Sequence, residues 1–222
     1  MTVKQVLKKL ESLGTERQRE FNKKNGASEK QFGVKRGDVR KVAKELKTNH
    51  ELALELWETE NIDARFLAIL ILKPDDLSKK EVEQMVKSET FTHLADWFTM
   101  YVSKKRKDKE ALRAKWMKSK NKMLARAAWH RTSDVAKKDP DSLELDALLD
   151  RIEKEMPKAK PEVQWTMNFA LVDIGISDKK RRKRAIAIGE EIGLYRDFPV
   201  PKGCTSPFAP IWIKEMVSRK KG

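Results

Sequence analysis

Apolar residues recur at spacings of three and four along most of this chain, which places them on one face of an α-helix. No stretch alternates apolar and polar residues convincingly as a half-buried strand does, and Asn25-Gly26 joins polar stretches, not two strands. The pattern predicts helices at 51–57, 64–72, 80–87, 96–104, 110–118, 122–137, 143–156 and 161–174, with proline or glycine at several of the breaks between them. The fold is therefore predicted to be all-α.

These helices are expected to pair as repeated hairpins. Ala64-Arg65 and Ala125-Arg126 each open the second helix of a pair, and Asp96 lies near the start of the second helix between them. The spacings from Arg65 to Asp96 and from Asp96 to Arg126 are 31 and 30 residues. Hairpin repeats of this length stack into an α-solenoid with a concave face, where corresponding positions form a row. Alternatively, each arginine simply packs on its helix and extends its charged end to solvent.

The two ends of the chain differ from the repeats. We expect one repeat domain over 1–222, with a polar helical segment at 1–30. An irregular segment at 193–222, rich in proline, is expected to pack onto the repeats, with one or two helical turns at 210–217.

Charge narrows the range of partners. The formal net charge is +15, which attracts polyanions, and basic clusters at 104–109, 115–122 and 179–184 spread that charge over several segments. DNA, RNA, acidic proteins and anionic membrane surfaces all remain open, as does a basic protein without a specific partner. No apolar run is long enough to span a membrane, no secretory signal is visible, and the single cysteine, Cys204, fits a reducing compartment.

Several kinds of chemistry find no support in the sequence. There is no phosphate-binding glycine loop, and Gly33 to Asp38 is interpreted as a helix start capped by Asp38. The three histidines, His50, His93 and His130, lack metal-ligand spacing, so neither a metal nor a cofactor is expected.

Asp96 is the candidate for chemistry, because a carboxylate in the middle of a basic row works against binding of a polyanion. It is either a structural group, such as a helix cap or the partner of an arginine, or a group retained for catalysis. Rings at Trp97, Trp165 and Phe169, interleaved with cations, are typical of nucleic-acid binding but equally of a helical core.

The chain resembles the DNA alkylation repair family, the AlkD-type alkylpurine DNA glycosylases. The resemblance covers roughly residues 30–215. It lies in 33–45 (GVKRGDVRKVAKE), 51–57 (ELALELW), 60–65 (ENIDAR), Asp96, 125–128 (ARAA) and 202–213 (KGCTSPFAPIWI). It implies a stack of HEAT-like repeats that holds duplex DNA in a basic concave cleft and hydrolyses the N-glycosidic bond of N3- or N7-alkylated purines. The family is thought to do so without swinging the damaged base into a pocket.

The resemblance also assigns residues. The family's catalytic carboxylate falls on Asp96 and its cleft arginine on Arg126. Three positions depart from the family pattern: Thr92 stands in place of a tryptophan, His93 in place of an acidic residue, and Phe169 in place of a second tryptophan. Asp96 would stabilise the positive charge that develops on the deoxyribose and orient a water molecule.

The leading hypothesis is a DNA glycosylase of base excision repair, a monomer acting on double-stranded DNA with alkylated purines, in the cytoplasm near the nucleoid. The alternative is a DNA-binding HEAT-like repeat protein of the same family that lacks excision, and a third is a scaffold for an acidic protein. Asp96 is the predicted catalytic residue. The predicted DNA contacts are Arg126, Arg65, Lys104, Lys122, Trp97, Phe169 and Thr92.

Overall fold

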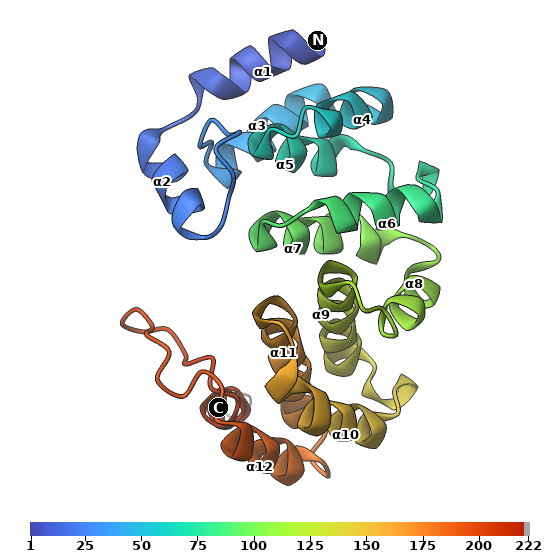
Figure 1. The fold of residues 1–222 in the computed structure, drawn as a ribbon, viewed down its shortest axis with the longest axis vertical. Coiled ribbons are helices and arrows are strands. Elements are labelled where there is room, and N and C mark those ends of the chain that lie inside the picture. The colour runs from blue at the N-terminus through green and yellow to red at the C-terminus, as the bar shows by residue number, and fades with distance from the viewer. Residues whose placement is uncertain (220–222) are drawn as a thin grey trace. The chain divides into compact units, whose positions relative to one another are not determined.

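The computed structural model describes residues 1–219, and these form α-helices joined by short turns, four 3-10 helices and two longer segments at 25–35 and 193–208 (Figure 1). Within these residues there is no β-strand, and the one isolated bridge joins Gly14 to Val34. None of the described helices has the length and apolarity needed to cross a membrane. The prediction of an all-α fold is confirmed.

The chain divides into two compact units, Met1–Leu112 and Arg113–Gly222, and the boundary falls inside α8. The first unit contains α1 (Val3–Ser12), α2 (Glu16–Lys24), α3 (Arg36–Leu46), α4 (His50–Glu58), α5 (Ile62–Ile71), η1 (Pro74–Asp76), α6 (Lys79–Ser88), α7 (Thr92–Tyr101) and η2 (Ser103–Lys105). After α8 (Lys109–Trp116), the second contains α9 (Lys122–Lys138), η3 (Pro140–Ser142), α10 (Leu145–Glu155), η4 (Met156–Lys158), α11 (Pro161–Ser177), α12 (Arg182–Ile192) and α13 (Ala209–Arg219). A stack of repeats can divide into compact units and still be one domain, because each repeat contacts only its neighbours. The prediction of one domain over 1–222 therefore stays a prediction.

The predicted hairpins are present as α4–α5, α6–α7, α8–α9 and α10–α11. Two differences from the predictions stand out. Asp38 does not cap α3, because that helix begins at Arg36 with Lys35 as its N-cap, and Asp38 instead pairs with Lys41 at 2.8 Å. The helix α12 was not predicted, because its basic start hides the short apolar stripe of Ala185, Ile188 and Gly189.

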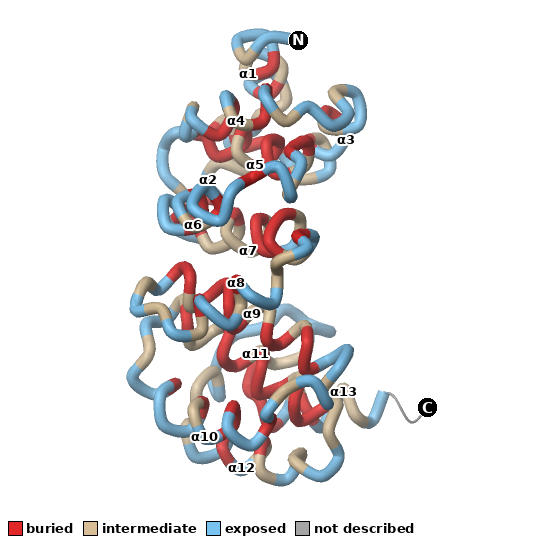
Figure 2. The backbone as a smooth tube through the Cα atoms, turned by 90° about the vertical axis from the view of Figure 1, so that its right-hand side faces the viewer, coloured by how far each residue is buried: buried red, intermediate tan, exposed pale blue. Residues whose placement is uncertain are grey.

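The core of the first unit is built around α5, which packs against α3, α4 and α7. Eight of its ten residues are buried, and the buried segments lie together in the interior of the unit (Figure 2). Phe66 meets Phe91 edge-on, with 6.3 Å between ring centroids, and this contact joins α5 to the start of α7. A helix that is apolar on nearly all sides in this way forms the centre of a unit.

Asp63 on α5 fixes the irregular segment that precedes α3. Its carboxylate is fully buried and accepts hydrogen bonds from the backbone N–H groups of Phe32, Gly33 and Val34 at 2.7, 2.9 and 3.0 Å. Arg36 adds a cation 4.0 Å away. Three donors and a nearby cation satisfy a buried charge that would otherwise be costly, so this contact sets where α3 starts.

The core of the second unit lies between the two longest helices, α9 and α11, each of 17 residues. The last helix, α13, closes this core with Ile213, which is fully buried. Two glycines allow that approach. A Cβ at Gly175 of α11 would lie 2.6 Å from Ile213, and one at Gly189 of α12 would lie 2.8 Å from Pro210.

Candidate nucleic-acid interface

Asp96, the predicted catalytic residue, lies in the second turn of α7 and is half-buried. The N-cap of α7 is Phe91, so the hypothesis that Asp96 caps this helix is wrong. The backbone N–H groups of Thr90 and Phe91, just before the helix, instead donate to Oε1 of Glu89, each at 2.8 Å. Asp96 interacts with another group of the protein, so it is not an isolated charge.

Thr92 is four residues before Asp96 and therefore lies on the same face of α7. Its side chain is half-buried and carries no ring. The next residue, His93, is also half-buried, and its ring lies 5.1 Å from Phe91 and 6.2 Å from Phe21. This face of α7 therefore presents a hydroxyl and an imidazole near Asp96, where the resembling family has a tryptophan and an acid.

Trp97, on another face of α7, belongs to a group of contacting rings and cations that we call the cation–ring layer. It comprises Arg36, Arg40, Phe66, Trp97, Tyr101 and Lys105. Arg36 lies 3.4 Å above the ring of Phe66, Arg40 lies 4.5 Å above that of Trp97, and Lys105 lies 5.5 Å from that of Tyr101. The rings also touch one another, with 5.0 Å between the centroids of Phe66 and Trp97.

The cations of this layer differ in exposure. Arg40 and Lys105 are exposed, whereas Arg36 is half-buried, and burial lowers its pKa to about 10 against the opposing effect of Asp63. Arg36 thus remains charged at neutral pH. Arg40 also donates to the hydroxyl of Tyr101 at 3.2 Å, which holds its guanidinium in place over the tryptophan. An arginine held against a ring loses little conformational freedom when it binds a phosphate, so these residues are suited to anion binding.

Sequence reasoning did not single out Arg36 or Arg40. They are four residues apart at the start of α3, so they share one face of that helix. That spacing is the signal that could have revealed them.

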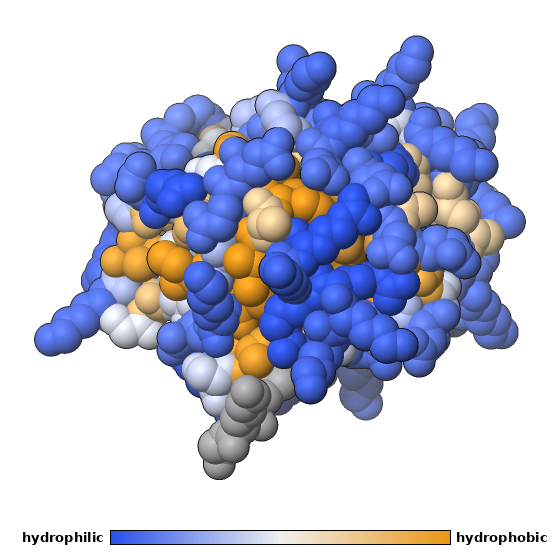
Figure 3. Space-filling model, turned by 90° about the horizontal axis from the view of Figure 1, so that it is seen from below, coloured by the Kyte–Doolittle hydropathy of each residue, from blue (hydrophilic) through white to orange (hydrophobic). Residues whose placement is uncertain are grey.

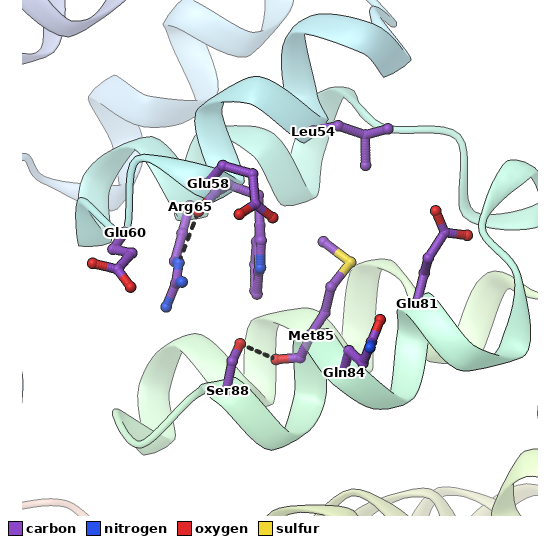
Figure 4. A pocket seen from close by; sticks show the side chains of 9 residues that line it. Leu54, Glu58, Glu60, Arg65, Glu81, Gln84, Met85 and Ser88 are labelled. Atoms are coloured by element: carbon purple, nitrogen blue, oxygen red, sulfur yellow. Dashed lines mark hydrogen bonds between the residues drawn. The ribbon is translucent and has the colours of Figure 1, made fainter.

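Arg65, a predicted DNA contact, forms hydrogen bonds with other groups of the first unit. Its Nε donates to the backbone carbonyl of Trp57 at 3.1 Å, and its Nη1 lies 3.3 Å from the buried carboxylate of Glu89. It therefore joins α4 and α5 to the segment before α7. It also lines a cavity of about 470 Å³ (Figure 4). The lining residues are Leu54, Trp57, Glu58, Glu60, Arg65, Glu81, Gln84, Met85 and Ser88.

Arg126 has a similar position in the second unit. It is only 3% exposed, and its Nη1 donates to the backbone carbonyl of Glu162 at 2.7 Å, which connects α9 to the first turn of α11. Lys122 at the start of α9 is exposed and lies 2.5 Å from the Glu162 carboxylate, whose pKa is lowered chiefly by that hydrogen bond. These contacts with Glu162 fix the start of α11. DNA binding by Arg65 and Arg126 stays a prediction.

Phe169 lies in an aromatic cluster of the second unit. Its half-buried ring contacts Trp165 at 5.4 Å, Trp212 at 5.5 Å and His130 at 6.2 Å. The cluster joins α9, α11 and α13.

Lys104, another predicted DNA contact, is half-buried in η2 of the first unit. The predicted row of Arg65, Asp96 and Arg126 includes residues of both units and stays a prediction.

Hydrophilic side chains dominate the surface near α12. Figure 3 shows one face of the molecule, on which hydrophilic residues surround a strip of apolar surface. Many of the cations near α12 are paired: Arg181 binds Asp146 and Asp178 at 2.7 and 3.0 Å, and Arg184 binds Asp150 and Glu153. The basic cluster at 179–184 is therefore partly neutralised by α10.

A solved structure is similar to this chain over almost its whole length. It is described as a new family of proteins related to the HEAT-like repeat DNA glycosylases, with affinity for branched DNA structures. The TM-score is 0.83 at 25% identity, and the match covers 99% of this chain and 95% of that one. The expected HEAT-like repeat fold is thereby confirmed.

Two curated relatives come from Listeria. The uncharacterized protein Lin0241 of Listeria innocua is 27% identical over 192 residues, which is 85% of this chain and 84% of that protein. The uncharacterized protein Lmo0209 of Listeria monocytogenes is 26% identical over 195 residues, or 86% and 85% of the two chains. The family model described as DNA alkylation repair enzyme matches residues 6–194. Its match confirms the resemblance seen in the sequence, and the chain belongs to the DNA alkylation repair enzyme family.

Proposed function

We propose that this protein binds DNA and prefers branched DNA over plain duplex. The observation that carries the proposal is the match over 99% of the chain to a protein family with affinity for branched DNA. The net charge of +15 supports it, because binding of phosphates by lysine and arginine supplies most of the affinity for DNA.

The cation–ring layer gives the first unit a means of binding phosphates. Arg40 and Lys105 are exposed, and each lies against a ring that limits its motion. Phosphate contacts of this kind position a protein on DNA without reading sequence. Recognition of branched DNA by shape requires no base-specific contact, and the sequence offers no known base-reading motif.

Binding can be tested with a labelled four-way junction and a duplex of the same arm sequence, measured by fluorescence anisotropy over a range of salt concentrations. We expect tighter binding to the junction and a log K that falls linearly with log salt for both. Equal affinities for the two DNAs would refute the preference. Binding that does not change with salt would refute phosphate contact.

A second candidate function is excision of N3- or N7-alkylated purines, and the position of Asp96 favours it. Asp96 is half-buried on α7 and is not used as a helix cap. The alkylated purine is cationic, so it leaves with the electron pair of the C1′–N bond as a neutral base. Water adds to C1′ and loses its proton, and Asp96 stabilises the positive sugar and accepts that proton before solvent does.

Excision can be measured directly as release of N7-methylguanine from methylated duplex DNA by the purified protein. We expect Asp96→Asn to lower the rate on the order of 10²- to 10³-fold. If the wild-type protein releases no base, only the DNA-binding function stands. If Asp96→Asn releases bases as fast as wild type, the assignment of Asp96 is wrong.

A further inference from the structure

The segment between α12 and α13 exposes an apolar tip, residues 198–201, that none of the contacts described so far explains. Residues 196–204 are all exposed, and Phe198 and Val200 remain 45% and 40% exposed. Figure 1 shows this segment as a loop that extends away from α12. Residues 198–201, Phe-Pro-Val-Pro, contain no charge in a chain in which 37% of residues are charged.

The tip is an ordered structure. The backbone N–H groups of Arg196, Phe198 and Cys204 donate to the carbonyls of Gly193, Tyr195 and Pro201 at 3.3, 3.2 and 3.0 Å, which closes three successive turns. Pro199 and Pro201 fix the backbone on both sides of Val200. Less conformational entropy is therefore lost when this tip contacts a partner than for a glycine-rich loop.

Aromatic side chains of the second unit support the tip. The ring of Phe198 lies 5.8 Å from Trp165 of α11 and 5.9 Å from Tyr195, and Tyr195 lies 5.1 Å from Trp165. Tyr195 has a φ of 66°, a strained value for a residue other than glycine. That strain costs on the order of 1–2 kcal/mol, and the ring contacts of Tyr195 offset it. The half-exposed ring of Phe198 thus packs against two half-buried rings, those of Trp165 and Tyr195.

A hollow lies beside these aromatic rings. Its volume is about 430 Å³, and its lining includes Tyr195, Arg196 and Phe198. The hollow is open to solvent over most of its extent, so it leaves the side of these rings accessible without enclosing a ligand.

The charges at the edge of the tip are mixed. Lys202 is exposed on one side, and Arg196 on the other pairs with Glu190 at 3.2 Å and covers the ring of Phe208. Asp197 beside them opposes binding of a phosphate. The tip is therefore poorly suited to the charged backbone of DNA and better suited to the faces of its bases.

We propose that Phe198, supported by Trp165 and Tyr195, is a wedge that stacks on the exposed base pair at a branch point of DNA; this rests on the proposed DNA-binding function. Apolar side chains can enter an intact base step, but separating the stacked bases costs a few kcal/mol. At a branch point a base-pair face is accessible with less unstacking. The wedge therefore stabilises the branched complex and contributes little to binding of intact duplex.

The test compares Phe198→Ala with wild type on a four-way junction and on a duplex of the same arm sequence. Stacking of one base on a ring is worth about 1–3 kcal/mol, so we expect junction affinity to fall about 5- to 150-fold. Duplex affinity should change less than about twofold. Ile211→Ala is the matched control, because Ile211 is 48% exposed on α13 of the same unit but has no place in the wedge.

A second measurement reports stacking itself. 2-Aminopurine placed at the branch point should change its fluorescence when wild-type protein binds, and Phe198→Ala should abolish that change while Phe198→Trp retains it. Junction binding by Phe198→Ala equal to wild type, or equal loss on junction and duplex, would overturn the wedge and leave DNA binding intact. A wild-type protein that binds neither DNA would instead overturn the proposed function, and the wedge with it.

Discussion

At the scale of single residues, several charged side chains of this protein bond to the backbone and do not face solvent. Arg65 and Arg126 each donate to a backbone carbonyl, of Trp57 and Glu162 respectively, and Asp63 accepts three backbone N–H groups. Polar contacts of this kind are costly to break, because the partner left behind is buried without a hydrogen bond.

Asp63 gives the clearest prediction of this kind. Asp63→Ala should lower the free energy of unfolding by about 3 kcal/mol, because three buried amide donors lose their acceptor and Arg36 loses a carboxylate 4.0 Å away. Thermal unfolding followed by circular dichroism should show a Tm lower by about 10 °C. Asp38→Ala is the control, since Asp38 pairs with a well-exposed lysine, and it should leave Tm nearly unchanged. Equal Tm values for the two variants would contradict this account of Asp63.

The contact between Arg106 and Asp108 predicts that the stability of the protein depends on pH. Arg106 is 5% exposed and donates to both carboxylate oxygens of Asp108 at 2.8 and 3.0 Å, and this hydrogen bonding lowers the pKa of Asp108 below its usual range. A carboxyl with a lowered pKa in the folded state stabilises the protein above its unfolded pKa of about 3.9, and this contribution is lost as pH falls through the folded value. Between pH 6 and pH 3 the Tm of wild type should therefore fall further than that of Asp108→Asn. Parallel falls would show that Asp108 does not contribute to acid sensitivity.

At the scale of helices, the sequence predicted the hairpins well and the tertiary contacts poorly. Amphipathic spacing and proline breaks are local properties, so α4–α5 through α10–α11 could be predicted from them. The partners of Arg65 and Arg126 lie 8 to 36 residues away in the chain, and nothing local distinguishes an arginine that caps a distant carbonyl from one that faces DNA. The cation–ring layer was missed for the same reason, since it combines α3, α5 and α7.

The packing of α12 against α13 can be tested through glycine. Gly189→Ala would place a Cβ 2.8 Å from Pro210, a rigid ring that cannot rotate away, so α13 must shift. We expect a loss of about 1–2 kcal/mol in the free energy of unfolding, despite the better helix propensity of alanine. Gly37→Ala in α3 meets no atom within 4 Å and should instead stabilise the protein by up to about 1 kcal/mol. Urea denaturation of both variants decides the matter, and a stabilised Gly189→Ala would disprove the close approach.

At the scale of the whole molecule, the net charge of +15 and the apolar wedge should contribute to DNA binding in different ways. Phosphate contacts release counterions and therefore set the dependence on salt, whereas a ring stacked on a base adds affinity without charge. The two contributions can thus be separated by measuring the salt slope and the affinity in the same variants.

Arg40 provides that test, because it is exposed and held over Trp97 at 4.5 Å. Arg40→Ala should weaken binding to junction and duplex alike and reduce the salt slope by about one, as expected for one lost phosphate contact. Phe198→Ala should lower only junction affinity and leave the slope unchanged. Lys41→Ala is the matched control on the same helix, since Lys41 already pairs with Asp38 at 2.8 Å, and it should change neither quantity. A salt slope that Arg40→Ala leaves unaltered would show that Arg40 binds no phosphate, because a cation that contacts no phosphate displaces no counterion from DNA.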